Sequence, residues 1–346
     1  MDLLLILAQL TLGMLGVLGV TSRDPGLIGE QLTYILIAFF ITAFISYIPP
    51  KRLVWLSTPA YFFSLALLIL VLFIGVSTPG QHAQRWIPIG SFTLQPSELM
   101  KVAVITYLAS FLHKHIGNWT LWKPMVVIGL ASGLILLETD VSTALFIFVL
   151  AVAILMVANT NFFRLFAIAA SAAIIAVALV FVVLKDDSHV SKRFDVFLHQ
   201  SSDSDLGYQP RMAKRAIKNS GITGLGPGIP IFVPASETDM ISVSIWQSLG
   251  ITGILSLIAM YVMIYIRGFQ IASFNNGPGS LLAAGAVIYV VGQAVLNLLV
   301  SAGRLPITGV VLPFVSHGVN NLLSVAVAMG FIHSNFRNSR KKLAAK

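Results

Sequence analysis

Two carboxylates lie at the point where a polar stretch becomes a long apolar one. In "FVPASETDMISVSIW", residues 232–246, Glu237 and Asp239 come just before the apolar run. An acid at this place interacts favourably with a helix dipole and can cap the helix. It can equally act as a general base at a membrane surface, because the apolar Met240 and Ile241 would desolvate the carboxylate and make it a stronger base. Asp239 is the better candidate for catalysis, since Glu237 is less constrained in direction.

A second group of ionisable residues falls in "QRWIPIGSFTLQPSELMK", residues 84–101. Glu98 and Lys101 are three residues apart at the start of an apolar helix, so they share a face and can form an ion pair. Ionisable residues inside a membrane cost about 2.5–3.5 kcal/mol each and are rarely idle. The pair is therefore either structural or part of an outward cavity, in which Lys101 and Arg85 present positive charge to an anionic ligand and Glu98 orients them.

Two further motifs combine polar residues with irregular backbone. "ETDVSTAL", residues 138–145, predicts a tight turn between two spans, in which Asp140 is a candidate for a buried network. "GRLPITGVVLPFVSHGVNN", residues 303–321, is rich in proline and glycine ahead of the last span, and irregular backbone at that depth is tolerated where protein or water covers it. We interpret it as a cavity wall. His317 within it is more often a structural residue than a ligand.

The long polar segment 185–240 carries a set of cations: Arg193, Arg211, Lys214, Arg215 and Lys218. A short helix is expected around "PRMAKRAIKN", where Lys214 and Lys218 would repel each other unless an anion lies between them. These cations form either a solvated face or, for one or two of them, a clamp for a pyrophosphate. A loop of this length is unusual unless it is functional.

The elements that position these residues follow from composition. The 346 residues are 57 % hydrophobic and 10 % charged, with a mean hydropathy of +0.88, which is far too apolar for one soluble core. The chain is therefore expected to be a membrane protein. It has no cysteine, which excludes disulfides and thiolate metal sites. The net charge of +9 does not come from basic runs with interleaved aromatic residues outside the spans, so nucleic-acid binding is not indicated.

Apolar runs of about 20 residues predict an all-α, polytopic integral membrane protein with ten transmembrane helices. We predict a single transmembrane domain over residues 1–346, with a long extracellular segment, 185–240, between spans seven and eight. The first run is interpreted as a span and not as a signal peptide, because it lacks a basic start and a cleavage site. The predicted spans are 3–20, 27–48, 54–76, 97–112, 123–138, 141–158, 162–184, 241–266, 280–301 and 316–335.

Charge gives the orientation, because short cytoplasmic loops collect lysine and arginine. With ten spans both termini lie on one side, and taking that side as cytoplasmic places half of the 22 basic residues there. Of the 13 acidic residues, only Asp2 falls on that side. The chemistry is therefore expected to face outward. The basic tail "RNSRKKLAAK" acts most simply as an orientation signal, with contact to anionic membrane lipids as a secondary role.

These motifs, in this order, resemble the SEDS family of bacterial cell-wall synthesis, which includes RodA, FtsW and SpoVE. The resemblance rests on "QRWIPIGSFTLQPSELMK", on "ETDVSTAL" for the family's "QPDLGTA", on "GYQPRMAKRAIKNSGITGLGPG", on "FVPASETDM" for "LPE-x-HTDF" and on "RLPITGVVLPFVSHG". It covers nearly the whole chain. Among the members we favour RodA.

The resemblance implies glycosyl transfer, the polymerisation of lipid II into glycan strands at the outer face of the bacterial plasma membrane. It makes Asp239 the essential acid, here the general base. A class B penicillin-binding protein, a transpeptidase, is the implied protein partner. Cations, or a divalent metal such as Mg²⁺ or Mn²⁺, would neutralise the leaving pyrophosphate. The substrate-binding candidates are Arg85, Trp86, Gln95, Glu98, Lys101, Asp140, Arg193, Lys214 and Ser316.

The sequence departs from the family pattern near the site. "QSLG", residues 247–250, replaces "EELG", residues 316–319 replace "SYGG", and Thr93 stands where relatives are frequently basic. Two other functions stay open: a transporter that moves lipid II across the membrane, and a non-catalytic scaffold for a penicillin-binding protein. A transporter would place its ionisable residues near the midplane in repeated halves, whereas here they cluster outward without a repeat.

Overall fold

The protein is nearly all helical. The structure is a computed structural model, and it describes residues 1–77, 84–90, 92–115, 122–158, 166, 170, 205–230, 232–274, 277–306 and 308–344. Its helices are α1 (Leu3–Arg23), the short 3₁₀ helix η1 (Pro25–Leu27), α2 (Ile28–Tyr47), α3 (Pro50–Trp55), α4 (Ser57–Ile74), α5 (Pro96–Lys114), α6 (Trp122–Leu137), α7 (Val141–Val157), α10 (Asp205–Ser220), α11 (Ile241–Ala272), α12 (Pro278–Ser301) and α13 (Val319–Ala344).

Each predicted span within the described residues overlaps one of these helices. In the part of the chain that the structure describes, five helical stretches are long and apolar enough to cross a membrane by length and composition, namely α1, η1 with α2, α4, α11 and α12. Helices α6 and α7 are apolar but shorter. The predicted span 54–76 begins too early, because Pro50 starts the separate short helix α3. The span 123–138 ends one residue too late, which leaves Glu138 in the turn after α6. The span 162–184 lies outside the described residues, apart from positions 166 and 170.

A small β-hairpin corrects the all-α expectation. Strands β1 (Ile87–Ile89) and β2 (Phe92–Leu94) pair antiparallel, with Ile87 opposite Leu94. The hairpin lies inside the motif that precedes α5, and Gln95 at its end is the N-cap residue of that helix. It therefore fixes where α5 starts.

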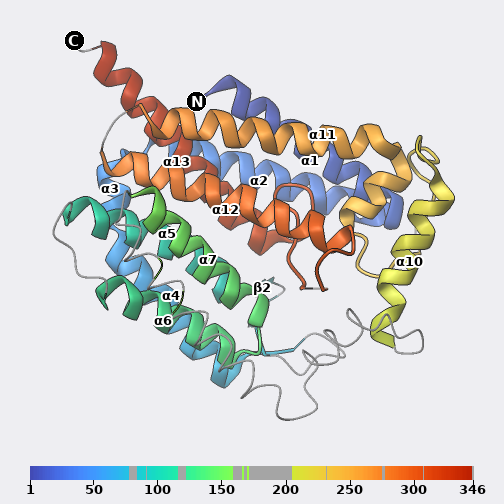
Figure 1. Cartoon of the computed structure of the whole chain (residues 1–346), viewed down its shortest axis with the longest axis horizontal. Helices are drawn as coiled ribbons and strands as arrows, with labels where there is room; N and C mark the ends of the chain where they lie inside the picture. Colours follow the sequence, from blue (N-terminus) through green and yellow to red (C-terminus); the bar gives the residue numbers. More distant parts are fainter. Residues whose placement is uncertain are drawn as a thin grey trace.

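The helices form one bundle around a continuous apolar core. In sequence-distant pairs, α1 packs along α11 and α2 along α13, while α12 contacts α5, α7, α11 and α13. Figure 1 shows both chain ends toward the upper left and α10 at the right, beyond the far end of the bundle. The backbone N–H of Asp2 donates to Nδ1 of the buried His333 at 3.1 Å, which confirms that the start of the chain lies against α13.

Helix α11 is broken at Gly250, which has φ 61° and ψ −145°. Helical hydrogen bonds are lost at such a break, and a glycine-rich segment, 221–230, crosses there and replaces them. The replacement bonds run from Leu225 N–H to the Gln247 carbonyl (2.7 Å), from Gly226 N–H to the Ser248 carbonyl (3.1 Å) and from Ile251 N–H to the Ile222 carbonyl (2.8 Å).

Candidate active site

Asp239 lies on a short irregular segment, 235–240, whose backbone carbonyls are held from several sides. The four successive carbonyls of residues 236–239 each accept a hydrogen bond from a residue outside the segment. Ser244 Oγ donates to the Ser236 carbonyl (2.7 Å), His317 N–H to that of Glu237 (2.8 Å), Ser316 Oγ to that of Thr238 (2.6 Å) and Asn297 Nδ2 to that of Asp239 (2.9 Å). The backbone that carries the candidate base is therefore fixed by residues of α11, α12 and the loop before α13.

The Asp239 side chain is half-buried and faces that loop. A Cβ built on Gly309, which has φ +75°, would lie 3.8 Å from Asp239 Oδ2, so the carboxylate passes close to bare backbone. Met240, the next residue, occupies the N-cap position of α11 and makes no side-chain capping bond. The other acid, Glu237, has its carboxylate 3.6 Å from the Arg23 guanidinium at the end of α1.

The loop between α12 and α13, residues 302–318, packs against the Asp239 segment. Its irregular backbone includes positive φ angles at Gly303, Gly309 and Phe314. Ser316 is buried, and its hydroxyl also accepts from Leu312 N–H at 2.8 Å, so it is occupied by backbone on both sides. His317 Nδ1 lies 3.0 Å from the Gln31 side-chain oxygen. Both residues therefore have structural contacts, as expected for His317.

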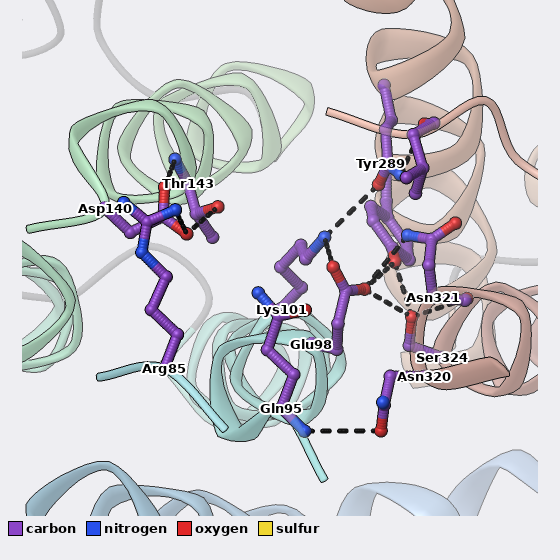
Figure 2. Close-up of polar contacts among 12 residues, drawn as sticks. Arg85, Gln95, Glu98, Lys101, Asp140, Thr143, Tyr289, Asn320, Asn321 and Ser324 are labelled. Carbon is purple, nitrogen blue, oxygen red and sulfur yellow. Dashed lines mark hydrogen bonds and ion pairs between the residues drawn. The ribbon is translucent and has the colours of Figure 1, made fainter. Parts of the chain in front are cut away.

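The Glu98–Lys101 ion pair predicted from spacing is confirmed. Lys101 Nζ lies 2.6 Å from Glu98 Oε1, and both side chains are almost fully buried. Glu98 Oε2 also accepts from residues of α12 and α13, as Figure 2 shows. These donors are Asn321 Nδ2 (3.0 Å), Ser324 Oγ (2.9 Å) and Tyr289 Oη (3.4 Å).

Lys101 does not present its charge in an outward cavity, which corrects that alternative. Only 3 % of the residue is exposed, and its ammonium also donates to Gln293 Oε1 at 3.4 Å and lies over the Tyr289 ring. Gln293 in turn donates to the Val311 carbonyl at 2.9 Å. The ion pair thus links α5, α12 and α13 inside the bundle. Gln293 connects it to the loop 302–318, which packs against the Asp239 segment.

Arg85 lies on the other side of α5 and holds the turn between α6 and α7. Its guanidinium donates to the Thr139 carbonyl at 2.7 Å and lies 3.6 Å from Asp140 Oδ2. Asp140 caps α7 by accepting from the Thr143 backbone (3.2 Å) and hydroxyl (2.9 Å). Figure 2 shows this group apart from the Glu98–Lys101 group, with no dashed line between the two. The predicted buried network at Asp140 is confirmed, but it is a separate cluster.

Glu138 is a residue that the sequence did not single out. It is 2 % exposed, and neither carboxylate oxygen has a hydrogen-bond partner among the described residues. Burial, and next the charge of Asp140, raise the pKa of Glu138 to about 8, against a smaller lowering by Arg85. Its carboxyl is therefore largely protonated at neutral pH. The only signal was its place before Asp140, which a plain turn also explains.

The basic helix expected in the polar segment is confirmed as α10. Lys214, Arg215 and Lys218 are exposed, while Ala213 on the same helix is buried in a small core with Val233. That core also contains Met240, next to Asp239. The buried side of the helix therefore packs near the Asp239 segment, while its basic side chains lie on the surface. Arg193 lies outside the described residues.

The remaining candidates lie around the β-hairpin. Trp86 is half-buried, and its carbonyl accepts from Val76 N–H at 2.8 Å. Gln95 N–H donates to the Asn320 side chain at 3.3 Å, and Asn320 donates to the Thr93 carbonyl at 2.7 Å, so α13 holds the hairpin at the start of α5. In the described part of the chain, no group of three or more His, Asp or Glu residues is placed to hold a metal ion.

An apolar pocket of about 540 Å³ opens between α11 and α12. Its lining includes Ser242 and Ser301, and Ser301 Oγ lies 3.4 Å from the Asp239 carbonyl. The rest of the lining is largely aliphatic and aromatic, including Trp246, Tyr261 and Leu298. The pocket thus runs from the neighbourhood of the candidate base along two apolar helices.

Comparison with known proteins gives a consistent result. The family model described as "Cell cycle protein", FTSW_RODA_SPOVE, matches residues 3–341. The chain is 28 % identical over 252 residues to the probable peptidoglycan glycosyltransferase FtsW of Methylomonas methanica, covering 70 % of this chain and 64 % of that relative. It is 26 % identical over 280 residues to the peptidoglycan glycosyltransferase MrdB of Escherichia coli, covering 78 % of this chain and 75 % of MrdB.

The fold is similar to that of a solved chain from a peptidoglycan synthase complex, with a TM-score of 0.83 and 25 % sequence identity over 98 % of both chains. The chain spans less than two thirds of the length of the Methylomonas relative.

Proposed function

Because the chain belongs to the FtsW, RodA and SpoVE family of cell cycle proteins, we propose that it is a peptidoglycan glycosyltransferase. Its substrate is lipid II, a disaccharide-peptide on undecaprenyl pyrophosphate, which it polymerises into β-1,4 glycan strands for cell elongation or division. The relatives in Methylomonas methanica and Escherichia coli are named for this activity.

The reaction is a single displacement that inverts the anomeric carbon. The 4-hydroxyl oxygen of the acceptor sugar attacks C1 of the donor sugar, and the bond from C1 to the pyrophosphate oxygen breaks with its electron pair. Asp239 takes the proton of the hydroxyl as general base, a contribution on the order of 10²–10⁴ in rate. The leaving undecaprenyl pyrophosphate carries negative charge away and needs cationic stabilisation.

One observation supports the assignment of the base: Asn297 and Ser316 hold the backbone carbonyls of Asp239 and Thr238, and the Asp239 carboxylate lies close to the backbone of Gly309. A base must be held within hydrogen-bond reach of the proton that it removes. Glu98 is a weaker candidate for the base, because its oxygens are occupied by Lys101 and by neutral donors. We therefore take Asp239, and not Glu98, as the base.

Cations for the leaving group come from the outward side of the chain. Lys214 on the exposed face of α10 is one candidate, and Arg193 is a second. Arg85, Trp86, Gln95 and Asp140 shape the hairpin side of the site. Ser316 acts through the Thr238 backbone and not by direct contact. The described residues do not form a ready-made metal site, so no step is assigned to a divalent ion.

The membrane arrangement that fits this chemistry has ten spans in one domain, with both termini cytoplasmic and residues 185–240 outside. The site then opens at the outer face of the bacterial plasma membrane, where lipid II is polymerised. The apolar pocket between α11 and α12 suits a polyprenyl tail, because it is lined by apolar side chains and begins beside Ser301. The protein partner is a class B penicillin-binding protein, as a transpeptidase must cross-link the strands that are made.

The experiment measures glycan-strand formation from labelled lipid II by the purified protein with its transpeptidase partner. Wild type, Asp239→Asn and Glu237→Gln are compared, with folding checked by thermal melting. We expect no polymer from Asp239→Asn and near wild-type polymer from Glu237→Gln, whose carboxylate pairs with Arg23. A folded Asp239→Asn that polymerises at the wild-type rate would remove Asp239 as the base. A folded wild type that only translocates lipid II would replace the enzyme by a transporter.

A further inference from the structure

Asn297 lies one turn before the end of α12 and is fully buried. Both of its amide hydrogens are used: Nδ2 donates to the Asp239 carbonyl at 2.9 Å and to the Val310 carbonyl at 2.7 Å. These two carbonyls belong to the irregular segment 235–240 and to the loop 302–318. A single side chain therefore joins the two irregular segments between which the Asp239 carboxylate lies.

The orientation of this amide follows from its partners. Both neighbours are carbonyl oxygens, which only accept, so the nitrogen and not the oxygen of the amide must face them. Asn297 Oδ1 accepts no hydrogen bond from the described residues. The side chain thus functions solely as a two-donor bridge between the segments.

Neighbouring turns of α12 repeat the arrangement. Four residues earlier, Gln293 joins Lys101 to the Val311 carbonyl. Four residues later, the Ser301 hydroxyl lies 3.4 Å from the Asp239 carbonyl. Residues four apart lie on one face of a helix. One face of α12 therefore carries a row of polar side chains on successive turns. These side chains contact the loop 302–318, the segment 235–240, or both.

We propose that Asn297 is a positioning residue for the glycosyl transfer, which sets the place of Asp239 through backbone hydrogen bonds without touching the substrate. This inference rests on the proposed function, because it requires Asp239 to be the base. Displacement of a catalytic group by about 1 Å can cost on the order of 100-fold in rate. Loss of the bridge is therefore expected to lower kcat by about 100-fold and to leave KM nearly unchanged.

The chain offers a matched control in Asn335 of α13. It is also fully buried, and its Nδ2 donates to a backbone carbonyl, that of Ile271, at 2.9 Å. A Cβ on Gly279 would meet the Asn335 side chain, which places this asparagine at the other end of α12. From Gly279 to Asn297 the helix rises by about 27 Å. Asn335 is thus also a buried asparagine that donates to a backbone carbonyl, but at a place far from the site.

The experiment determines kcat and KM for lipid II polymerisation, and the melting temperature, for wild type, Asn297→Leu, Asn297→Ser, Asn335→Leu and Asp239→Asn. Leucine removes the donors at similar volume, and serine keeps one short donor. We expect both leucine variants to melt at a lower temperature, but only Asn297→Leu to lose kcat, with Asn297→Ser between it and wild type. If Asn297→Leu does not fold, the decision rests on Asn297→Ser, with an expected tenfold or greater loss of kcat.

The outcomes separate the two proposals. If Asp239→Asn is inactive while folded Asn297 variants keep the wild-type kcat, the positioning role is wrong and the base stands. If Asn335→Leu loses as much kcat per folded molecule as Asn297→Leu, the effect comes from general destabilisation and the positioning role is again wrong. If Asp239→Asn is active, the proposed base itself fails.

Discussion

Two buried glutamates of this protein have opposite surroundings. Glu98 has an ammonium group and neutral donors around it, so its charge is compensated. Glu138 has no hydrogen-bond donor among the described residues, and the nearest cation, Arg85, is shared with Asp140 and the backbone of the turn. Burial of an uncompensated carboxylate favours the protonated form. Glu138 is therefore expected to make the stability of the protein depend on pH.

Replacing Glu138 by glutamine is expected to remove a pH dependence of stability. The pKa of Glu138 is raised from 4.5 to about 8 in the folded protein, chiefly by burial. Between these values the unfolded chain releases the proton while the folded protein keeps it, so the free energy of unfolding falls as pH rises. The full effect is on the order of 4–5 kcal/mol, present above about pH 8 and absent below about pH 4.5. Glutamine mimics the protonated acid and should be the more stable protein at pH 8.

The measurement is the melting temperature in detergent from pH 5 to pH 9 for wild type, Glu138→Gln and Glu30→Gln. Glu30 is an exposed glutamate, so its variant controls for the loss of one carboxylate at the surface. Wild type and Glu30→Gln should lose stability toward pH 8, and Glu138→Gln should not. An equal loss in all three proteins would show that Glu138 ionises normally in the folded state.

Residue spacing predicted local partners but not distant ones. Glu98 and Lys101 pair because a three-residue spacing on a helix brings them together. This spacing can be read directly from the sequence. The further donors to Glu98, Asn321 and Ser324, are more than 220 residues away in sequence. They meet Glu98 because α13 packs against α5, which no local pattern encodes. For the same reason Asn297 was not recognised as a contact of Asp239.

At the scale of elements, the break in α11 is the feature that hydropathy does not reveal. An apolar run predicts one continuous span, and the helix indeed continues on both sides of Gly250. The break arises because the segment 221–230 crosses α11 with its own backbone, which requires glycine at the crossing. A Cβ on Gly224 would lie 2.6 Å from the backbone nitrogen of Gly250. The sequence showed the glycines of "GITGLGPG" and of "QSLG", but not that they meet.

Gly250→Ala is therefore expected to be severely destabilising. The residue has φ +61°, a conformation that favours glycine, and an added Cβ would overlap the backbone of Ile222 and Thr223. Backbone atoms cannot move aside as a flexible side chain can, so the crossing has to open and the first turns of α11, next to Asp239, shift with it. We expect a large drop in melting temperature and the loss of polymerisation.

The matched control is Gly129→Ala in the middle of α6, where an added Cβ meets nothing within 4 Å. Alanine is favoured over glycine in a helix interior by about 1 kcal/mol, so this variant should melt at or above the wild-type temperature. Thermal melting and lipid II polymerisation are measured for both variants. A Gly250→Ala protein as stable and active as Gly129→Ala would mean that the crossing adapts without cost.

At the scale of the whole molecule, the contacts at the chain ends place both termini at the same end of the bundle. Asp2 accepts from Arg267 of α11 at 2.8 Å, and its backbone donates to His333 of α13. The start of the chain, the later part of α11 and the end of α13 are thus joined at one end of the bundle, where Arg340, Lys341 and Lys342 follow. Figure 1 shows α10 beyond the opposite end. Short basic segments tend to stay in the cytoplasm, so we expect α10 and Asp239 to lie outside.

Single cysteines test this orientation without a background, because the chain contains none. Lys218→Cys places a thiol on the exposed face of α10, and Lys342→Cys places one in the basic end of α13, also exposed. In intact bacterial spheroplasts a membrane-impermeant maleimide should label Lys218→Cys, whereas Lys342→Cys should react only after the membrane is permeabilised. Ala283→Cys, buried in α12, is the control that should stay unlabelled in both cases until the protein is denatured. Labelling of Lys342→Cys from outside would show that the chain has the opposite orientation. Asp239 would then face the cytoplasm, where the glycan strands of an external wall are not made.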